Sequence, residues 1–139
     1  MAALRIVMDT NVLYAGLRSS RGASYALLRA IDKGAVRIVL STALLFEYED
    51  VVKRNQAELG LSDQNIEELL NTLCQVSEHQ KVYFLWRPCL PGVKDDHVLE
   101  LAIASGADSI VTHNVRHFEG AAQFGMKVRT AKEIVESIA

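Results

Sequence analysis

Carboxylate side chains occur at positions of this sequence that are far apart but similarly placed within local patterns. They are Asp9, Glu47 and the adjacent pair Asp95 and Asp96, and Asn114 adds an amide. Carboxylates that converge from separate segments repel one another unless a cation lies between them. Because no Cys or paired His accompanies them, the oxygen ligands favour Mg²⁺ or Mn²⁺ over zinc. Such a metal lowers the pKa of a bound water and neutralises phosphate oxygens, which is the chemistry of hydrolysis at phosphorus.

Helix capping is the simpler explanation for some of these residues. Asp, Thr and Asn at 9–11 are good residues for a helix start, and either Asp95 or Asp96 suits the same role. At about 100° per residue, Asp95 projects within roughly 20° of the apolar side of its expected helix, whereas Asp96 points away. Glu47 lies on the flank of the apolar stripe of its own helix. Helix capping does not require these carboxylates to lie close together. A shared metal site does require it, so it is the more specific hypothesis.

The hydrophobic periodicity predicts strands that alternate with helices. We expect strands at 4–8, 36–40, 81–86, 109–114 and 126–129, and helices at 11–17, 24–34, 41–54, 62–76, 95–107 and 130–139. This alternation is typical of an α/β fold, a three-layer αβα sandwich around a mainly parallel sheet of about five strands.

The parallel sheet also predicts where a site lies. Ligands bind beyond the carboxyl ends of the strands in open α/β sheets. Asp9 ends the first strand and Asn114 ends the strand at 109–114, so both are expected at that edge. Asp108 precedes its strand and is expected at the opposite edge, in a turn or cap.

Composition limits the class of protein. The chain has 139 residues, 50% of them hydrophobic and 23% charged, which predicts one globular domain over 1–139. The net charge of −2 argues against a protein that coats nucleic acid by positive field but does not exclude a nuclease. Cys74 and Cys89 form no zinc pattern and require no disulfide. With no membrane-spanning run and no signal peptide, we expect a cytoplasmic protein.

Four sequence motifs occur together in a fixed order. They are "MDTNVL", "LLFEYEDVVKR", "KDDHVLELAIASGAD" and "VTHNVRHF". In this order and spacing, from residue 5 to about residue 135, the chain resembles a PIN-domain ribonuclease of the kind found as VapC-type toxins in toxin–antitoxin pairs. The PIN-like resemblance covers nearly the whole chain, and although each motif alone is weak, the set is moderately specific.

The resemblance implies an endoribonuclease that uses Mg²⁺ or Mn²⁺. The first three motifs assign Asp9, Glu47 and Asp95 to the metal, with Asp96 as an auxiliary ligand, and the fourth assigns Asn114 to orienting a water or phosphate. It also implies RNA as substrate, a homodimer, and an antitoxin partner that covers the acidic groove, with no membrane. One later acidic position of the family is filled here by other residues, His117 and then Glu119, which leaves a one-metal mechanism open.

Several polar residues are candidates for supporting roles. We expect Thr10 and Asn11 to hold the Asp9 loop near the substrate, and Arg18 and Arg116 to contact phosphates, with solvated surface charge as the alternative. We interpret His97, His113 and His117 as surface or structural residues. The aromatic residues at 83–86 are interpreted as packing residues rather than base-stacking ones.

Other classes of protein fit the sequence less well. A phosphatase of the haloacid-dehalogenase type needs a second Asp two residues after the first, where Asn11 stands. A dinucleotide-binding domain needs a glycine-rich turn after the first strand, which is missing. The alternative that remains is a non-catalytic PIN-like module that binds protein or RNA.

Overall fold

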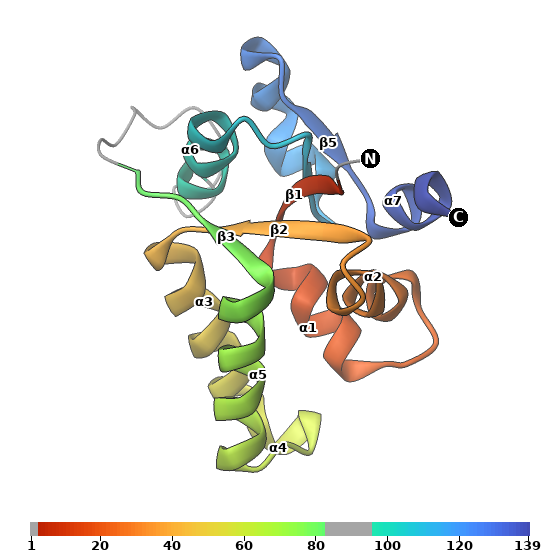
Figure 1. Ribbon diagram of the computed structural model, residues 1–139, viewed down its shortest axis with the longest axis vertical. Helices are drawn as coiled ribbons and strands as arrows, with labels where there is room; N and C mark the ends of the chain where they lie inside the picture. Colours follow the sequence, from red (N-terminus) through yellow and green to blue (C-terminus); the bar gives the residue numbers. More distant parts are fainter. Residues whose placement is uncertain (1–2, 83–95) are drawn as a thin grey trace.

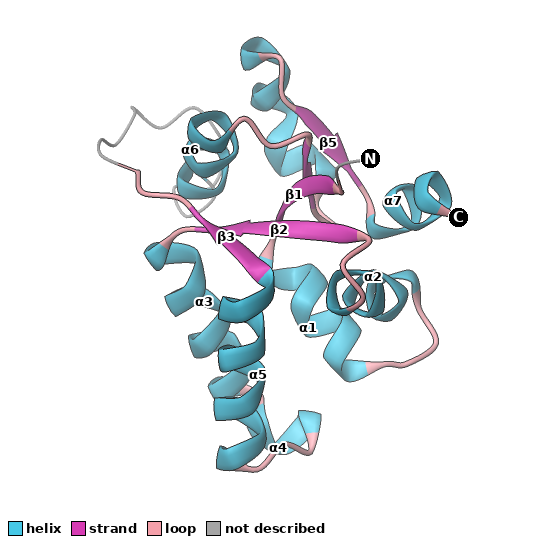
Figure 2. Cartoon of the chain, in the orientation of Figure 1, coloured by secondary structure: helices cyan, strands magenta, loops and turns pink. Residues whose placement is uncertain are grey.

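The structure is a computed structural model that describes residues 3–82 and 96–139 (Figure 1). Its centre is an all-parallel five-stranded sheet in the order β3-β2-β1-β4-β5 (Figure 2). The strands are β1 Leu4–Met8, β2 Val36–Leu40, β3 Ser77–His79, β4 Ser109–Val111 and β5 Lys127–Arg129. The predicted α/β fold with a mainly parallel sheet is therefore confirmed.

Helices cover both faces of this sheet. They are α1 Thr10–Arg18, α2 Ala23–Asp32, α3 Thr42–Arg54, α4 Gln56–Leu59, α5 Asp63–Val76, α6 Asp96–Ser105, α7 Ala131–Ile138 and the 3₁₀ segment η2 Val115–Phe124. Helices α1, α2, α3 and α5 lie on one side of the strands and α6 lies on the other (Figure 1). Covering both faces is what a parallel sheet requires, and Ile6, Val7 and Met8 of β1 are accordingly inaccessible to solvent.

The local sequence explains where most helices begin. Ser41 accepts a hydrogen bond from the Leu44 amide at the start of α3. Ser62 and Thr130 each form a capping box, at the starts of α5 and α7. A hydroxyl oxygen at each of these three positions satisfies an otherwise unpaired amide of the first turn, which is why serine and threonine favour the start of a helix.

The strand predicted at 81–86 is wrong where it can be tested. The third strand is Ser77–His79, and residues 81 and 82 are not in a strand, while 83–86 lie outside the described residues. A three-residue polar strand carries no hydrophobic alternation, so periodicity could not reveal it. The sequence analysis also did not predict the short helix α4 or the segment η2.

An ion pair holds the end of the sheet opposite the predicted site. Arg5 of β1 donates to both carboxylate oxygens of Glu78 on β3, at 2.9 and 2.6 Å, and also to the carbonyls of Ser105 and Gly106 after α6. The Arg5 guanidinium lowers the pKa of the Glu78 carboxyl. Asp108 accepts from the Arg5 amide here, as expected of a turn residue at this edge.

No helix within the described ranges is long and apolar enough to cross a membrane.

Candidate active site

Asp9 lies at the junction of β1 and α1, at the carboxyl edge of the central strand. Its amide donates to the carbonyl of Val111 at 2.8 Å, which extends the pairing of β1 with β4. Its Oδ1 accepts from the Thr10 amide at 2.9 Å, and its Oδ2 accepts from the Thr112 hydroxyl at 2.8 Å. Asp9 is therefore the cap of α1 and also a buried carboxylate, 7% exposed, at the predicted edge.

Glu47 is connected to Asp9 through Thr10. Helix α3 buries Leu44, Tyr48 and Val52 against the core, and Glu47 lies on the flank of that side as the helical arithmetic predicts. The Thr10 hydroxyl donates to Glu47 Oε1 at 2.5 Å, while the Thr10 amide bonds Asp9. One residue thus orients both carboxylates.

The two carboxylates act together on a buried phenol. Tyr48 is fully buried and its hydroxyl donates to the Met8 carbonyl at 2.5 Å. Burial and then the negative charges of Asp9 and Glu47 raise the pKa of Tyr48 well above its usual value. The negative charges of Asp9 and Glu47 therefore both act at this edge of the sheet, where a cation would be attracted to them.

His97 has a role that the sequence interpretation missed. Its Nε2 donates to Glu47 Oε2 at 2.6 Å, and its side chain is half-buried, 23% exposed. The histidine comes from α6, fifty residues from its partner, and only the packing of α6 beside α3 brings them together. No local pattern carries that information.

Thr112 is the second residue that was missed. It follows β4 directly, is inaccessible to solvent and donates to Asp9. Its oxygen accepts from the Asn114 amide at 3.0 Å and from the Asn11 side chain at 3.4 Å. The "VTHN" motif therefore places a threonine, more directly than the asparagine, against the carboxylate.

The other residues predicted for the site are Asn114, Asn11 and the adjacent pair Asp95 and Asp96. Asn114 is exposed and begins η2 without a side-chain cap, and Asn11 Oδ1 accepts from the His113 amide at 3.3 Å. Asp95 lies outside the described residues, and Asp96 is the first residue of α6, with its side chain not described.

Both candidate arginines are exposed. Arg18 is in the last turn of α1, its guanidinium carbon 5.9 Å from the centre of the Tyr14 ring. Arg116 lies in η2. The expected contact of Arg18 and Arg116 with phosphate stays a prediction.

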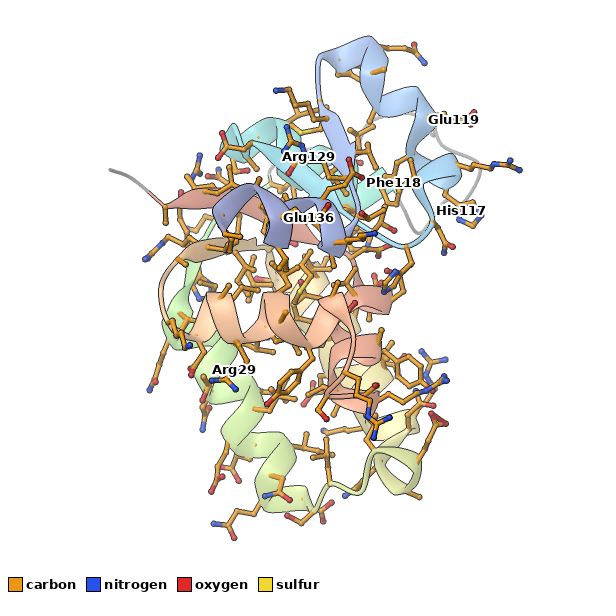
Figure 3. The ribbon with its side chains drawn as sticks, turned by 90° about the vertical axis from the view of Figure 1, so that its right-hand side faces the viewer. Arg29, His117, Phe118, Glu119, Arg129 and Glu136 are labelled. Atoms are coloured by element: carbon orange, nitrogen blue, oxygen red, sulfur yellow. The ribbon has the colours of Figure 1, made fainter. Side chains whose placement is uncertain are left out.

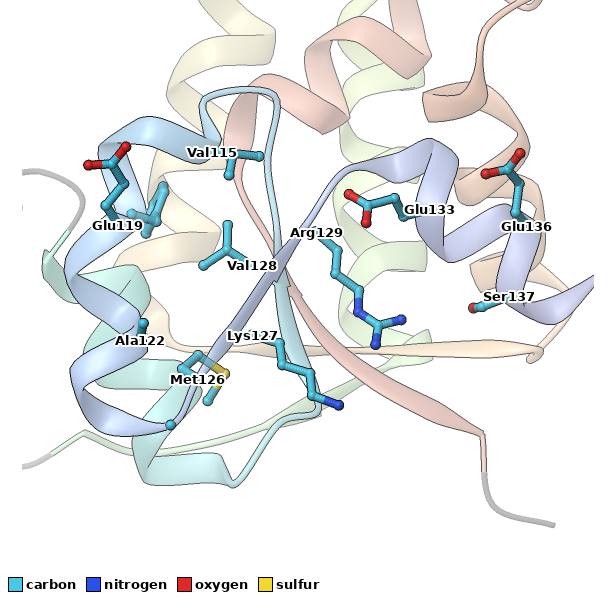
Figure 4. A pocket seen from close by; sticks show the side chains of 12 residues that line it. Val115, Glu119, Ala122, Met126, Lys127, Val128, Arg129, Glu133, Glu136 and Ser137 are labelled. Atoms are coloured by element: carbon cyan, nitrogen blue, oxygen red, sulfur yellow. The ribbon is translucent and has the colours of Figure 1, made fainter.

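A groove of about 930 Å³ runs along β5 between η2 and α7 (Figure 4). Glu119 lines it, and both His117 and Glu119 are on η2 (Figure 3). Neither Asp9 nor Glu47 lines this groove. Glu119 therefore lines a groove to which Asp9 and Glu47 do not contribute.

The donors at this edge fit a hard divalent cation. Asp9 and Glu47 bring carboxylate oxygens to this edge, and carboxylate oxygens are ligands that Mg²⁺ and Mn²⁺ prefer. Within the described part of the chain no three acidic, His or Cys side chains form a metal cage. Magnesium does not need one, since it commonly takes one or two carboxylates and completes its shell with water and phosphate.

Sequence comparison agrees with this geometry. The sequence model of the PIN domain matches residues 5–116, which include the ends of β1 and β4 and all of α3 and α6. The chain belongs to the PIN-domain family. No curated protein matches it.

Among solved structures, this PIN domain resembles a chain of VapBC2 from Rickettsia felis, solved in complex with a DNA fragment from their promoter. The two share 16% identity over 91% of this chain and 98% of that chain, with a TM-score of 0.62, which supports a common fold.

Proposed function

We propose that this PIN-domain protein is a Mg²⁺- or Mn²⁺-dependent endoribonuclease that hydrolyses RNA phosphodiester bonds. The observation that carries the proposal is the pairing of Asp9 and Glu47 through Thr10 at the carboxyl edge of the sheet. Carboxylate oxygens that converge at one edge of the sheet suit a metal ion that also binds a phosphate of the substrate.

We assign metal binding, proton transfer and orientation of the water or phosphate to different residues of the site. Asp9 and Glu47 hold the metal, together with Asp96, the first residue of α6, and Asp95, which precedes it in the sequence. A metal bound there activates water and neutralises charge on the phosphate oxygens. One of the carboxylates accepts the proton released by the attacking water, and Asn114 orients that water or the phosphate.

The neighbouring residues fix the position of these groups. Thr112 orients Asp9, and Thr10 and His97 orient Glu47, so the carboxylates are held before substrate arrives. Arg18 and Arg116 are exposed, and in this proposal they contact the RNA backbone.

We also propose that the protein is the toxin of a toxin–antitoxin pair, acts in the cytoplasm and forms a homodimer. The structural neighbour is named as VapBC2, a complex, which supports a partner protein here. An apolar cavity of about 240 Å³ between α1, α2 and α5 offers such a partner a place to bury side chains. Growth arrest on expression, relieved by a co-expressed neighbouring gene product, tests the toxin role, and sedimentation tests the dimer.

The central experiment measures cleavage of a mixed-sequence RNA pool with Mg²⁺, with Mn²⁺ and with EDTA. Wild-type protein should cut only with metal, and Asp9→Asn and Glu47→Gln should each lose at least about a hundredfold in rate. Glu49→Gln is the matched control, because Glu49 is on the same helix but pairs with Lys53 at 2.9 Å on the outside. That variant should cut normally.

The non-catalytic alternative predicts a different outcome. If folded wild-type protein neither cuts RNA nor binds either metal by calorimetry, the domain is a binding module and the catalytic proposal is wrong. If cutting is observed, Asp95→Asn and Asp96→Asn, measured side by side, decide which of these two adjacent carboxylates matters.

A further inference from the structure

A pocket of about 520 Å³ lies between the helices α1, α2 and α7, which are neighbours in the fold (Figure 1). Three of the segments that line it come directly after strands: α1 follows β1, His113 follows β4 and α7 follows β5. The carboxyl ends of parallel strands meet at one edge of a sheet, and ligands of open α/β sheets bind there. This pocket is therefore at the same edge as Asp9.

The pocket adjoins the acidic residues through Asn11. Asn11 lines the pocket, and its side-chain amide donates to the Thr112 hydroxyl oxygen at 3.4 Å. That hydroxyl donates to Asp9 at 2.8 Å, and Asn11 also follows Thr10, which donates to Glu47. A group bound in the pocket is therefore a close neighbour of a group held by the two carboxylates.

The side chains that line this pocket are basic or neutral. Arg18 and Lys132 both line it and both are exposed, and none of the described residues around it is acidic. Neither cation forms an ion pair with a carboxylate among residues 3–82 and 96–139, and Arg18 lies over the ring of Tyr14. In a chain with a net charge of −2, such a pocket is a local attraction for an anion.

Two carboxylates lie next to residues of the pocket without lining it. Glu133 accepts from the Thr130 amide at 3.0 Å and lines the groove along β5. Glu58 accepts from the Tyr14 hydroxyl. Each of these carboxylates already has a hydrogen-bond donor, so the two cations of the pocket stay available to a ligand.

His113 supplies a further hydrogen-bond donor at this pocket. Its Nε2 is 3.0 Å from the hydroxyl oxygen of Ser24, which is only 5% exposed and lies in the first turn of α2. When the Ser24 hydroxyl donates to Nε2, the ring carries its proton on Nδ1 and can donate that proton to an acceptor. The sequence interpretation of His113 as a surface or structural residue did not include this pairing.

A phosphate group fits this set of donors. Guanidinium, ammonium and imidazole N–H groups only donate here, and the unesterified oxygens of a phosphodiester only accept. Asp9 and Glu47 repel a phosphate when no metal is bound, so a basic pocket beside them supplies an attraction that they lack. Contacts of this kind position a nucleic-acid strand without reading its bases.

We propose that this pocket binds an internal phosphate of the RNA backbone, next to the phosphate that is cut, through Arg18, Lys132 and His113. The inference rests on the proposed nuclease function and assigns the place where the flanking part of the substrate is held. Because only phosphate is recognised, the pocket accepts RNA of any sequence.

Binding of a fluorescent single-stranded oligouridine in EDTA tests the pocket without cleavage. Its affinity is measured by anisotropy at several salt concentrations, since each phosphate contact contributes about 0.7 to the slope of log K against log salt. Arg18→Gln and Lys132→Gln should each lower that slope by about 0.7. Lys33→Gln is the matched control, because it removes the same charge at the opposite end of α2 and should leave the slope unchanged.

Two results would overturn the pocket. One is a wild-type slope in both Arg18→Gln and Lys132→Gln, or no salt-dependent binding by the wild type. The other comes from the same oligouridine with a 5′-phosphate in place of its 5′-hydroxyl. Tighter binding of the phosphorylated strand that Lys132→Gln abolishes would assign the pocket to strand ends and not to the backbone, whereas equal binding of both strands supports the proposal.

Cleavage of RNA with Mg²⁺ or Mn²⁺ separates this proposal from the nuclease function. Metal-dependent cutting by a protein whose salt slope neither substitution changes refutes the phosphate pocket and leaves the nuclease standing. A slope that falls in both variants but not in Lys33→Gln, in a protein that never cuts RNA, supports the pocket and refutes the nuclease. If both proposals hold, Lys132→Gln should raise KM for RNA severalfold with kcat nearly unchanged.

Discussion

Thr10 connects the two carboxylates of the site, so its hydroxyl is a precise target. In Thr10→Val the backbone bond to Asp9 remains while Glu47 Oε1 loses its donor. We expect kcat to fall about ten- to a hundredfold, as for other residues that orient metal ligands, with KM for RNA nearly unchanged. Thr72→Val, at an exposed position of α5, serves as the control. A normal kcat in Thr10→Val would show that Glu47 needs no orientation.

Tyr48 gives a pH dependence with a definite sign. Because the pKa of Tyr48 is raised in the folded protein, the unfolded chain loses this proton first as the pH rises above about 10. The stabilisation is complete below that pH and is lost above it, by up to about 1.4 kcal/mol per pH unit. Tyr48→Phe lacks this proton and also loses the hydrogen bond to the Met8 carbonyl, at a cost of about 1–2 kcal/mol.

The measurement for Tyr48 is the free energy of unfolding in EDTA from pH 7 to 11. The wild type should be more stable at pH 7, and the difference from Tyr48→Phe should shrink above pH 10. A constant difference across this range would contradict the raised pKa.

At the scale of elements, the approach of α1 to α2 depends on one glycine. A Cβ on Gly16 would lie 2.5 Å from Leu28 Cδ1 and 3.0 Å from the Ser24 carbonyl oxygen. Gly16→Ala should destabilise the protein by about 1–2 kcal/mol, because overpacking outweighs the roughly 1 kcal/mol by which alanine favours a helix.

Thermal unfolding of a double-mutant cycle checks the contact between α1 and α2. Leu28→Ala alone is destabilising, but the added cost of Gly16→Ala should be smaller in its presence, since the closest clash is removed. Equal costs in both backgrounds would mean that the two helices can move apart freely.

The elements themselves were predicted to different degrees. Helices α1, α3 and α5 and strands β1 and β2 follow from apolar spacing and capping residues, because their side chains face a core in regular order. Strand β3 was misplaced, since Ser77–His79 is polar and owes its pairing to β2 alone. A strand of that kind is selected by its neighbour and not by its own residues.

At the scale of the whole molecule, the acidic edge should make stability depend on metal. A ligand that binds only the folded state stabilises it by about 2.7 kcal/mol at one hundred times its Kd. Mn²⁺ or Mg²⁺ should therefore raise the Tm of the wild type relative to EDTA, and Asp9→Asn should lose that rise. An equal rise in the wild type and in Asp9→Asn would place the metal elsewhere on the molecule.

The sequence by itself determined that Asp9 lies at the carboxyl end of β1 and that Glu47 lies beside the buried side of α3. Asp9 ends a buried apolar strand and Glu47 flanks an apolar helical stripe, and both facts are local because strand and helix periods are local. Only the tertiary structure decided which groups touch these carboxylates. His97 and Thr112 gain their contacts from the packing of α6 and β4 against distant segments, and no spacing within the chain records such contacts.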